Sequence, residues 1–368
     1  MTYLDYSATT PTNDEVLDTF IKASKFVGNP NSLHKLGAES KELIDASTKQ
    51  IANILKVKPS EIIYTSGASE ANNMAIKGIE IYKNRGNNII TTDLEHSSIY
   101  GPLEYMINNG YNVSYVPLKN GLVSLESLEN MITDDTILVS INAVNSETGV
   151  RQNIEKIGGI LKKYPKVIFH SDITQAVGKV NIDLSNVDLA SFSAHKFFGI
   201  KGIGVLIKKE NINLMPLISG GASTTIYRSG TPATSLIAST AKALRLAYEN
   251  INIEYVSILN NKIKDKLKEY KYVHINSNEY SIPHILNFSI EKVKPETFLH
   301  ALEEDDIYIS TQSACSKSKT SRSVLAITNS EFFAVSSLRV SISVKTTMED
   351  INKFLESFDK NYRKLVLK

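Results

Sequence analysis

Residues 167–208 read VIFHSDITQAVGKVNIDLSNVDLASFSAHKFFGIKGIGVLIK and contain three short runs of apolar and β-branched residues. Runs of this length that are bounded by Gly, Asn or Asp predict β-strands. The three predicted strands are Val167–Ser171, Leu189–Ser193 and Gly204–Lys208. Two polar residues that are able to do chemistry follow two of these strands, Asp172 after the first and Lys196 shortly after the second. The stretch therefore predicts a sheet with reactive side chains at the ends of its strands.

The same alternation of short apolar runs and longer amphipathic stretches extends toward the N-terminus. Further strands are predicted at Glu61–Thr65, Asn88–Thr92, Asn112–Val116 and Thr136–Ala143. Helical patterns lie between them at Glu70–Lys83, Tyr100–Asn108 and Ile154–Tyr164. Strands that alternate with helices predict an α/β protein whose large domain has a mostly parallel sheet between helices. In such sheets, ligands bind at the carboxyl ends of the strands, and we expect the active residues there.

The pattern changes in the last third of the chain. The predicted elements there are long helices at Ser235–Asn250 and Glu254–Tyr270, strands at His284–Ser289 and Leu338–Ser343, and a helix near Thr297–Glu304. These elements predict a smaller α+β domain. We expect residues 12–250 to form the large domain, and residues 1–11 with 251–368 to form the small one. Residues 310–323 are rich in Ser and Lys and have no apolar periodicity, so we expect a mobile surface loop there.

The composition excludes several kinds of partner. The 368 residues carry a formal net charge of +2, so no overall field attracts nucleic acid or an anionic membrane. The first residues lack the basic and apolar segments of a signal peptide, and no apolar run is long enough to span a bilayer. With Cys315 as the single cysteine, neither an intrachain disulfide nor a cysteine-only metal site is possible. We expect a cytoplasmic protein without a metal ion, direct nucleic-acid contacts or a membrane anchor.

Lys196 and Asp172 together indicate the chemistry of one cofactor. A lysine after a buried strand is costly unless it is paired or neutral, and a neutral amine forms Schiff bases. Pyridoxal phosphate needs an acid beside its pyridine nitrogen, and Asp172 suits that role. Gln175, three residues further along, is able to donate to the phenolic oxygen of the same ring. Taken singly, Lys196 reads as a surface lysine beside a turn and Asp172 as a helix cap, so the inference needs both.

A phosphate site is predicted where residues 65–73, TSGASEANN, lead from a strand into a helix. Free backbone N–H groups around Ala68 and the helix dipole attract a phosphate, and the Ser69 hydroxyl is a further donor. Ser193 and Thr231 are able to supply additional hydroxyls. The same residues also fit an ordinary capped helix, so this motif is weak evidence when taken alone.

Three more residues are candidates for the site. His96 follows a predicted strand and is able to stack on a flat ring and move protons, although a loop histidine is more commonly solvated. Arg339 lies in a predicted strand, where its planar fork suits an α-carboxylate if the side chain faces the cleft rather than solvent. Cys315 lies among Ser, Ala and Lys residues, and the lysines favour its reactive thiolate form. The alternative for Cys315 is a small buried apolar residue.

These motifs occur together in one known family. The chain contains LDYSATTP, GNPNS, TSGASEANN, EHSSIY, HSDITQAVGK, SAHKFFGIKGIG, RSGTP, SACS and SSLRVS. In their order and spacing they resemble the pyridoxal-phosphate-dependent cysteine desulfurases of the NifS/IscS type, over essentially the whole chain. The resemblance implies the fold type I of pyridoxal-phosphate-dependent transferases (class V aminotransferases) and a homodimer. It also implies conversion of L-cysteine to L-alanine, with the sulfur held as a persulfide on Cys315.

The resemblance implies a role for each candidate residue. The implied catalytic residues are Lys196, which would carry the cofactor, His96, which would stack on its ring, and Cys315. The implied cofactor-binding residues are Ala68, Ser69, His96, Asp172, Gln175, Ser193, His195, Lys196 and Thr231. Of these, Thr231 would reach the phosphate of the other subunit. Arg339 would bind the substrate carboxylate.

The chain departs from the family pattern at several positions. Ser69 replaces a threonine, and Ser146 replaces an asparagine that normally touches cofactor and substrate. Ala194 and Ile200 replace Gly and Pro, and residues 220–231, GGASTTIYRSGT, lack the usual Gln-Glu. These differences suggest a divergent or specialised member of the family.

Alternatives to a desulfurase remain open at this point. One is a class V aminotransferase or another pyridoxal phosphate lyase without sulfur transfer, against which Cys315 argues. The other is a catalytically weak scaffold of a sulfur-transfer complex, against which Lys196 and Asp172 argue. The resemblance leaves the sulfur acceptor open among an iron–sulfur scaffold and the enzymes of tRNA or thiamin thiolation.

Overall fold

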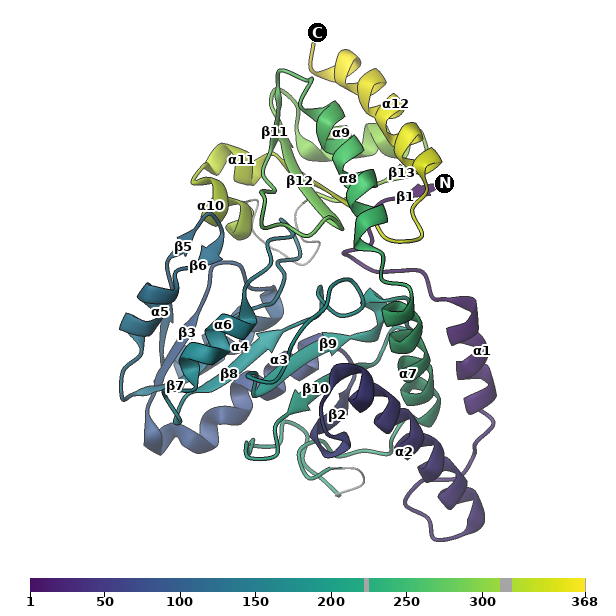
Figure 1. The fold of residues 1–368 in the computed structure, drawn as a ribbon, viewed down its shortest axis with the longest axis vertical. Coiled ribbons are helices and arrows are strands. Elements are labelled where there is room, and N and C mark those ends of the chain that lie inside the picture. The colour runs from purple at the N-terminus through teal and green to yellow at the C-terminus, as the bar shows by residue number, and fades with distance from the viewer. Residues whose placement is uncertain (222–224, 312–319, 368) are drawn as a thin grey trace.

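The computed structural model describes residues 1–221, 225–311 and 320–367 and has a seven-stranded sheet at its centre (Figure 1). The strands lie in the order β2 (Ile62–Thr65), β10 (Gly204–Lys208), β9 (Leu189–Ser193), β8 (Ile168–Asp172), β7 (Thr136–Ser140), β3 (Asn88–Thr91) and β4 (Asn112–Tyr115). Strand β10 runs antiparallel to both of its neighbours, and all other neighbouring pairs are parallel. The predicted mostly parallel sheet is confirmed, with small shifts at the strand ends.

Helices cover both faces of this sheet. Because side chains alternate along a strand, Val205 and Ile207 of β10 enter the core on one face and Leu206 enters the core on the other. The first core includes α2 (Lys35–Leu55), α5 (Leu125–Met131), α6 (Ile154–Leu161) and α7 (Thr234–Glu249), and the second includes α3 (Ala68–Gly78) and α4 (Ser97–Asn108). In the described parts of the chain, no helix has the length and apolar character needed to cross a membrane.

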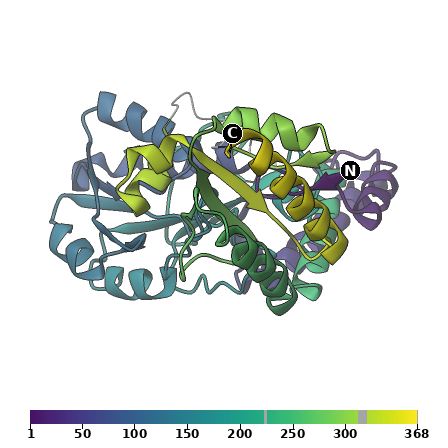
Figure 2. The ribbon, with the colours of Figure 1, turned by 90° about the horizontal axis from the view of Figure 1, so that it is seen from above.

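A separate core is built from both ends of the chain. Its sheet has the order β11 (Val273–Ile275), β12 (Ile285–Ile290) and β14 (Ser337–Ser341), with antiparallel pairing. The helices of this core are α8 (Ile253–Leu267), α9 (Pro295–Glu303) and α12 (Met348–Leu365). The N-terminal strand β1 (Thr2–Tyr3) pairs with β13 (Ile307–Tyr308), and both chain ends therefore lie in this part of the molecule (Figure 2). The domain boundaries expected near residues 11 and 250 stay predictions.

Several local predictions were wrong. The helix expected up to Lys83 leaves the α conformation after Gly78, a poor helix former, and continues as the 3-10 helix η2 (Ile79–Arg85). Helix α4 begins at Ser97, earlier than expected, because His96 caps it. The end of the expected loop 310–323 starts a helix instead, since Ser321 caps α10 (Arg322–Thr328) through the backbone N–H of Val324. A short helix α11 (Glu331–Val335) was not expected.

Candidate active site

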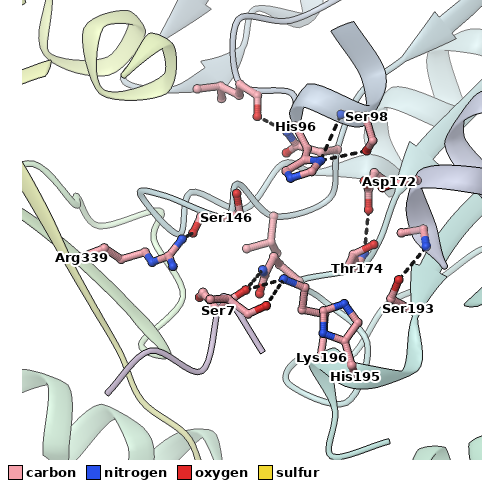
Figure 3. A pocket seen from close by; sticks show the side chains of 17 residues that line it. Ser7, His96, Ser98, Ser146, Asp172, Thr174, Ser193, His195, Lys196 and Arg339 are labelled. Atoms are coloured by element: carbon pink, nitrogen blue, oxygen red, sulfur yellow. Dashed lines mark hydrogen bonds between the residues drawn. The ribbon is translucent and has the colours of Figure 1, made fainter. Parts of the chain in front are cut away.

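One pocket lies where the chain leaves β8 and β9, opposite Arg339 of β14 (Figure 3). The predicted site residues that line it are Ala68, Ser69, His96, Asp172, Gln175, Ser193, His195, Lys196 and Arg339. The structure therefore brings these residues together at the expected edge of the sheet. Thr231 is exposed and does not line this pocket. Cys315 lies outside the described residues.

Lys196 reaches the pocket from a tight turn. Strand β9 is buried throughout and ends at Ser193, after which residues Ala194–Lys196 form a single 3-10 turn. The Lys196 Nζ donates hydrogen bonds to the carbonyl oxygens of Ser7, at 2.7 Å, and Ala8, at 2.8 Å. The N-terminal segment of the chain thus forms one wall of the pocket and holds the amine (Figure 3).

Asp172, the last residue of β8, is held by two donors. Its Oδ1 accepts the backbone N–H of Thr174 at 2.9 Å, and its Oδ2 accepts from Asn72 Nδ2 at 2.8 Å. Asn72 also donates to Ser98 Oγ at 2.8 Å and is fully buried. Asn72 was not among the predicted site residues. Its spacing in the sequence could have identified it, because Asn72 lies one helical turn after Ala68 and therefore on the same face of the helix.

His96 is the N-cap of α4. Its Nδ1 accepts the backbone N–H of Ser98 at 3.1 Å and lies 2.8 Å from Ser98 Oγ. Because a backbone N–H only donates, Nδ1 carries no proton, and the proton of the neutral ring is on Nε2. Burial lowers the pKa of His96, which keeps the ring neutral near pH 7. The ring therefore presents a donor and not a base through Nε2.

The start of α3 brings together three of the residues that were predicted to bind a phosphate, Ala68, Ser69 and Ser193. The backbone N–H of Ala68 donates to Ser193 Oγ at 2.6 Å, which ties the first turn of α3 to the end of β9. Gly204 of β10 passes so close to this turn that a Cβ on it would lie 2.6 Å from the Cα of Gly67. Ser69 is exposed at the pocket. The site thus combines a helix N-terminus with adjacent hydroxyl groups.

His195 belongs to the same side of the pocket. Its Nδ1 lies 3.1 Å from Thr9 Oγ1, and its carbonyl oxygen accepts from the backbone N–H of Thr10 at 2.9 Å. Burial, together with the nearby ammonium of Lys196, lowers the pKa of His195 to about 4. At neutral pH the ring is uncharged, so His195 offers a phosphate a hydrogen bond and not a positive charge.

Arg339 crosses from the second core to the pocket. Its Nη2 lies 2.7 Å from Asp5 Oδ1, and its Nη1 donates to the carbonyl oxygen of Ser146 at 2.9 Å. The side chain is only 3% exposed, and its Nε is buried without a hydrogen-bond partner among the described residues. Of the two orientations left open by the sequence, the structure has Arg339 lining the pocket, and Ser146 contacts it through its backbone carbonyl.

A buried acid lies behind the pocket. Glu95 Oε1 accepts from Thr92 Oγ1 at 2.7 Å and from the backbone N–H of Asn142 at 3.0 Å. Burial raises the pKa of Glu95 to about 8, and the nearby carboxylate of Asp172 adds to this increase. The protonated form of Glu95 is therefore favoured at neutral pH.

The pocket chemistry fits the predicted cofactor, pyridoxal phosphate. The amine of Lys196, the carboxylate of Asp172 and the amide of Gln175 match its aldehyde, its pyridine nitrogen and its phenolic oxygen. A phosphate would fit at the start of α3, where Gly67 has no side chain and Ser193 Oγ lies within contact distance. These residues line one pocket, which is the arrangement that the cofactor requires.

Comparison with known proteins supports the same identification. The family profile described as Aminotransferase class-V matches residues 2–354. A NifS/IcsS protein homolog of Lactobacillus delbrueckii subsp. bulgaricus is 41% identical over 381 aligned positions, which cover 99% of this chain and 97% of the relative. A cysteine desulfurase IscS of Buchnera aphidicola subsp. Baizongia pistaciae is 38% identical over 99% of this chain and 93% of its own.

A solved structure of a NifS-like protein shares the fold. It superposes with a TM-score of 0.93 at 33% identity and covers 99% of this chain and 100% of its own. The family profile covers the central sheet, most of the second core and every pocket residue described above. The chain therefore belongs to the class-V aminotransferase family, among the homologues of the NifS and IscS proteins.

Proposed function

We propose that this chain is a cysteine desulfurase, which converts L-cysteine to L-alanine and holds the sulfur as a persulfide on Cys315. The observation that carries the proposal is that Lys196, Asp172 and Arg339 line one pocket. An amine, an acid and a carboxylate-binding fork are the groups that pyridoxal phosphate chemistry on an α-amino acid requires. The IscS relatives, which are named as cysteine desulfurases, support cysteine as the amino acid.

The class-V family implies pyridoxal phosphate as the cofactor. When bound, it supplies an electron sink that stabilises negative charge at the α-carbon of the amino acid. The residues that would hold it are Lys196 at the aldehyde carbon, Asp172 at the pyridine nitrogen, Gln175 at the phenolic oxygen, His96 on the ring face, and Ala68, Ser69, Ser193 and His195 at the phosphate. In a homodimer, Thr231 of a second copy would complete the phosphate site.

The substrate carboxylate would bind Arg339. Two arginine donors are engaged, by Asp5 and by the Ser146 carbonyl, while the buried Nε has no hydrogen-bond partner among the described residues. A carboxylate that enters the pocket therefore gains an available donor and competes with Asp5 for the guanidinium. The binding of the substrate at this point would orient its α-carbon toward Lys196, which lines the same pocket.

Lys196 would move the α-proton. The carbonyl groups of Ser7 and Ala8 only accept hydrogen bonds, so they hold the amine without taking its proton. His96 has its Nδ1 occupied by the Ser98 N–H and would act through Nε2 as a donor. Lys196 would thus act as the base and His96 as a hydrogen-bond donor.

The sulfur would leave through Cys315, whose role rests on the sequence because this residue lies outside the described parts of the chain. The thiolate would attack the substrate sulfur, so that an S–S bond forms while the C–S bond breaks. The bonding pair stays with carbon, which takes up a proton, and alanine is released. The persulfide would then pass to an acceptor protein, either an iron–sulfur scaffold or an enzyme of tRNA or thiamin thiolation.

The test is an incubation of purified, pyridoxal-phosphate-loaded protein with L-cysteine and a thiol reductant, with alanine and sulfide measured together. We expect equal amounts of both products without any keto acid. The variant Cys315→Ala should keep the cofactor absorbance and lose the persulfide, which is detected as a mass increase of one sulfur on the wild-type protein. The variant Lys196→Ala should lose the cofactor band that reports the covalent link.

Other outcomes would contradict the proposal. Product formation that requires a keto acid would identify an aminotransferase. Bound cofactor without turnover, even with added acceptor proteins of each class, would support the scaffold alternative that Ser146 motivates. Undiminished sulfide release by Cys315→Ala would remove Cys315 from the reaction.

A further inference from the structure

Lys179 is a buried lysine that the function described above leaves unexplained. It is 7% exposed, and among the described residues its Nζ has a single hydrogen-bond acceptor, Gln175 Oε1 at 2.8 Å. No carboxylate forms an ion pair with it there, whereas the ammonium of Lys196 and the guanidinium of Arg339 lie near enough to repel it. Burial and these two cations lower the pKa of Lys179 to about 7. Such a group costs stability and is expected to have a compensating role.

The partner of Lys179 is a residue of the pocket wall. Gln175 lines the pocket, and its Nε2 donates to the carbonyl oxygen of Ser7 at 2.9 Å. A carbonyl only accepts, so the Ser7 oxygen takes the Nε2 donor of the amide and leaves Oε1 for Lys179, whose N–H groups donate to it in the charged and in the neutral form. The Ser7 oxygen also accepts from Lys196 Nζ at 2.7 Å. Lys179, Gln175, Ser7 and Lys196 therefore form one continuous chain of hydrogen bonds that runs from the buried Lys179 to the pocket.

This orientation decides what Gln175 offers to a ligand. One N–H of Nε2 is used by Ser7, which leaves the second N–H as the polar group that is available to the pocket. If the amide were reversed, its carbonyl oxygen would face an oxygen of the ligand and repel it. Without Lys179, Oε1 would be buried with no donor, and the orientation shown here would lose one of its two supports.

We propose that Lys179 is a positioning residue that holds the Gln175 amide with an N–H donor toward the ring oxygen of the bound cofactor. The proposal rests on the proposed function for the identity of that cofactor. The proposal distinguishes positioning from a structural role, because replacing the buried ammonium by an apolar side chain of similar length removes the cost of burying a charge, and this gain offsets the lost donor to Gln175 Oε1. Lys179→Met should therefore fold as well as the wild type. It should lose only the preference for a ligand that carries the ring oxygen.

The experiment uses cofactor-free protein and two probes that cannot react with Lys196. These are pyridoxine phosphate, which has the ring oxygen and no aldehyde, and its analogue that lacks the ring hydroxyl. The ratio of the two dissociation constants, measured by calorimetry, reports the ring oxygen alone. For the wild type we expect a preference of about tenfold for pyridoxine phosphate, since one hydrogen bond to a charged oxygen is worth about that factor. Lys179→Met should bring the ratio close to one, with the affinity for the deoxy analogue unchanged.

A second background distinguishes positioning from a direct charge effect. In Gln175→Leu, the additional change Lys179→Met should alter the ratio no further, because the amide that it positions is absent. A ratio that still falls in this background would mean that the Lys179 charge acts on the ring directly, and would overturn the proposal. An unchanged ratio in Lys179→Met alone, a wild-type ratio of one, or a Lys179→Met variant that no longer folds would each overturn it as well. Absence of binding by both probes to the wild type would instead overturn the proposed cofactor and function.

Discussion

The guanidinium of Arg339 and the carboxylate of Asp5 form an ion pair, with 2.7 Å between Nη2 and Oδ1. Asp5 follows β1 at the start of the chain, and Arg339 lies in β14 near its end. The pair therefore ties the N-terminal segment, whose Ser7 and Ala8 hold Lys196, to the strand that would bind the substrate carboxylate. Lys196 and Arg339 are linked through one short stretch of backbone.

Loss of this ion pair should cost stability. Arg339 is 3% exposed and Asp5 is 19% exposed, so the substitution Asp5→Asn leaves a buried guanidinium with its charge uncompensated. We expect the free energy of unfolding of cofactor-free protein to fall by about 2 kcal/mol. Urea denaturation measures the change. Asp18→Asn, which breaks the exposed pair with Lys22, is the matched control and should change stability by less than about 1 kcal/mol. Equal effects of the two substitutions would mean that burial of the Asp5 pair adds nothing.

The capping of α4 by His96 can be tested separately from the proposed contact of its ring with the cofactor. The variant His96→Asn keeps an acceptor for the backbone N–H of Ser98, whereas His96→Ala removes it. We expect His96→Ala to be less stable than His96→Asn by about 1 kcal/mol, measured by thermal or urea denaturation. Both variants should lose the ring contact with the cofactor to the same extent. Equal stability of the two variants would show that Nδ1 is not the cap, and the assignment of the proton to Nε2 would fail with it.

The titration of His96 should be visible in the pH dependence of stability. Burial lowers the pKa of His96 in the folded state, so on acidification the unfolded state takes up this proton first. The contribution of His96 to stability is therefore constant above the pKa of the unfolded chain, about 6.5, and decreases as the pH falls below it. The difference in unfolding free energy between wild type and His96→Asn isolates this group from the other titrating residues. A difference that stays constant below pH 6.5 would contradict the lowered pKa.

Much of the site was predictable because strand ends are local features. Asp172 and Lys196 follow runs of apolar residues that are long enough to predict buried strands, and the carboxyl ends of such strands meet at one edge of the sheet. The resemblance to the family then implied which group of the cofactor each of these residues would contact. The order of the strands, with β10 antiparallel beside β9, was not predicted, since the sequence only showed that the sheet is mostly parallel.

Other parts of the site depend on contacts that no local pattern contains. Asn72 reads as a polar residue on a surface helix, and Lys179 after a glycine reads as a solvated turn lysine, yet both are buried against pocket residues. The pairing of Asp5 with Arg339 joins opposite ends of the chain. His96 was not recognised as a cap because Ser, Thr, Asp and Asn are the residues usually found at that position.

The close approach of β10 to the phosphate site predicts a strong effect of one methyl group. A Cβ at Gly204 would lie 2.6 Å from Gly67 Cα and 2.7 Å from the Phe192 carbonyl oxygen, and both are backbone atoms. We expect Gly204→Ala to lose about 3 kcal/mol of stability, measured by urea denaturation, and to bind pyridoxine phosphate at least tenfold more weakly. A Cβ at Gly101 in α4 would meet no atom of the described residues within 4 Å, so Gly101→Ala is the control and should be neutral or slightly stabilising. If Gly204→Ala bound pyridoxine phosphate with wild-type affinity, β10 would not shape the phosphate site.

The lowered pKa of Lys179 predicts a second pH dependence of stability. In the unfolded chain this lysine is charged up to about pH 10.5, whereas in the folded chain it is charged only up to about pH 7. Between pH 7 and pH 10.5 the unfolded state binds this proton and the folded state releases it, so the stability of the wild type rises with pH. Lys179→Met lacks this group. We therefore expect its advantage over the wild type to be largest below pH 7 and to shrink across this window, by at most about 1.4 kcal/mol per pH unit.

Urea denaturation of the two proteins across the same range measures this difference directly, since all other groups titrate in both. Lys25→Met, at an exposed position of the chain, controls for the loss of a lysine charge as such and should give no such slope. If Lys179→Met parallels the wild type at every pH, the ammonium is not buried as the structure has it.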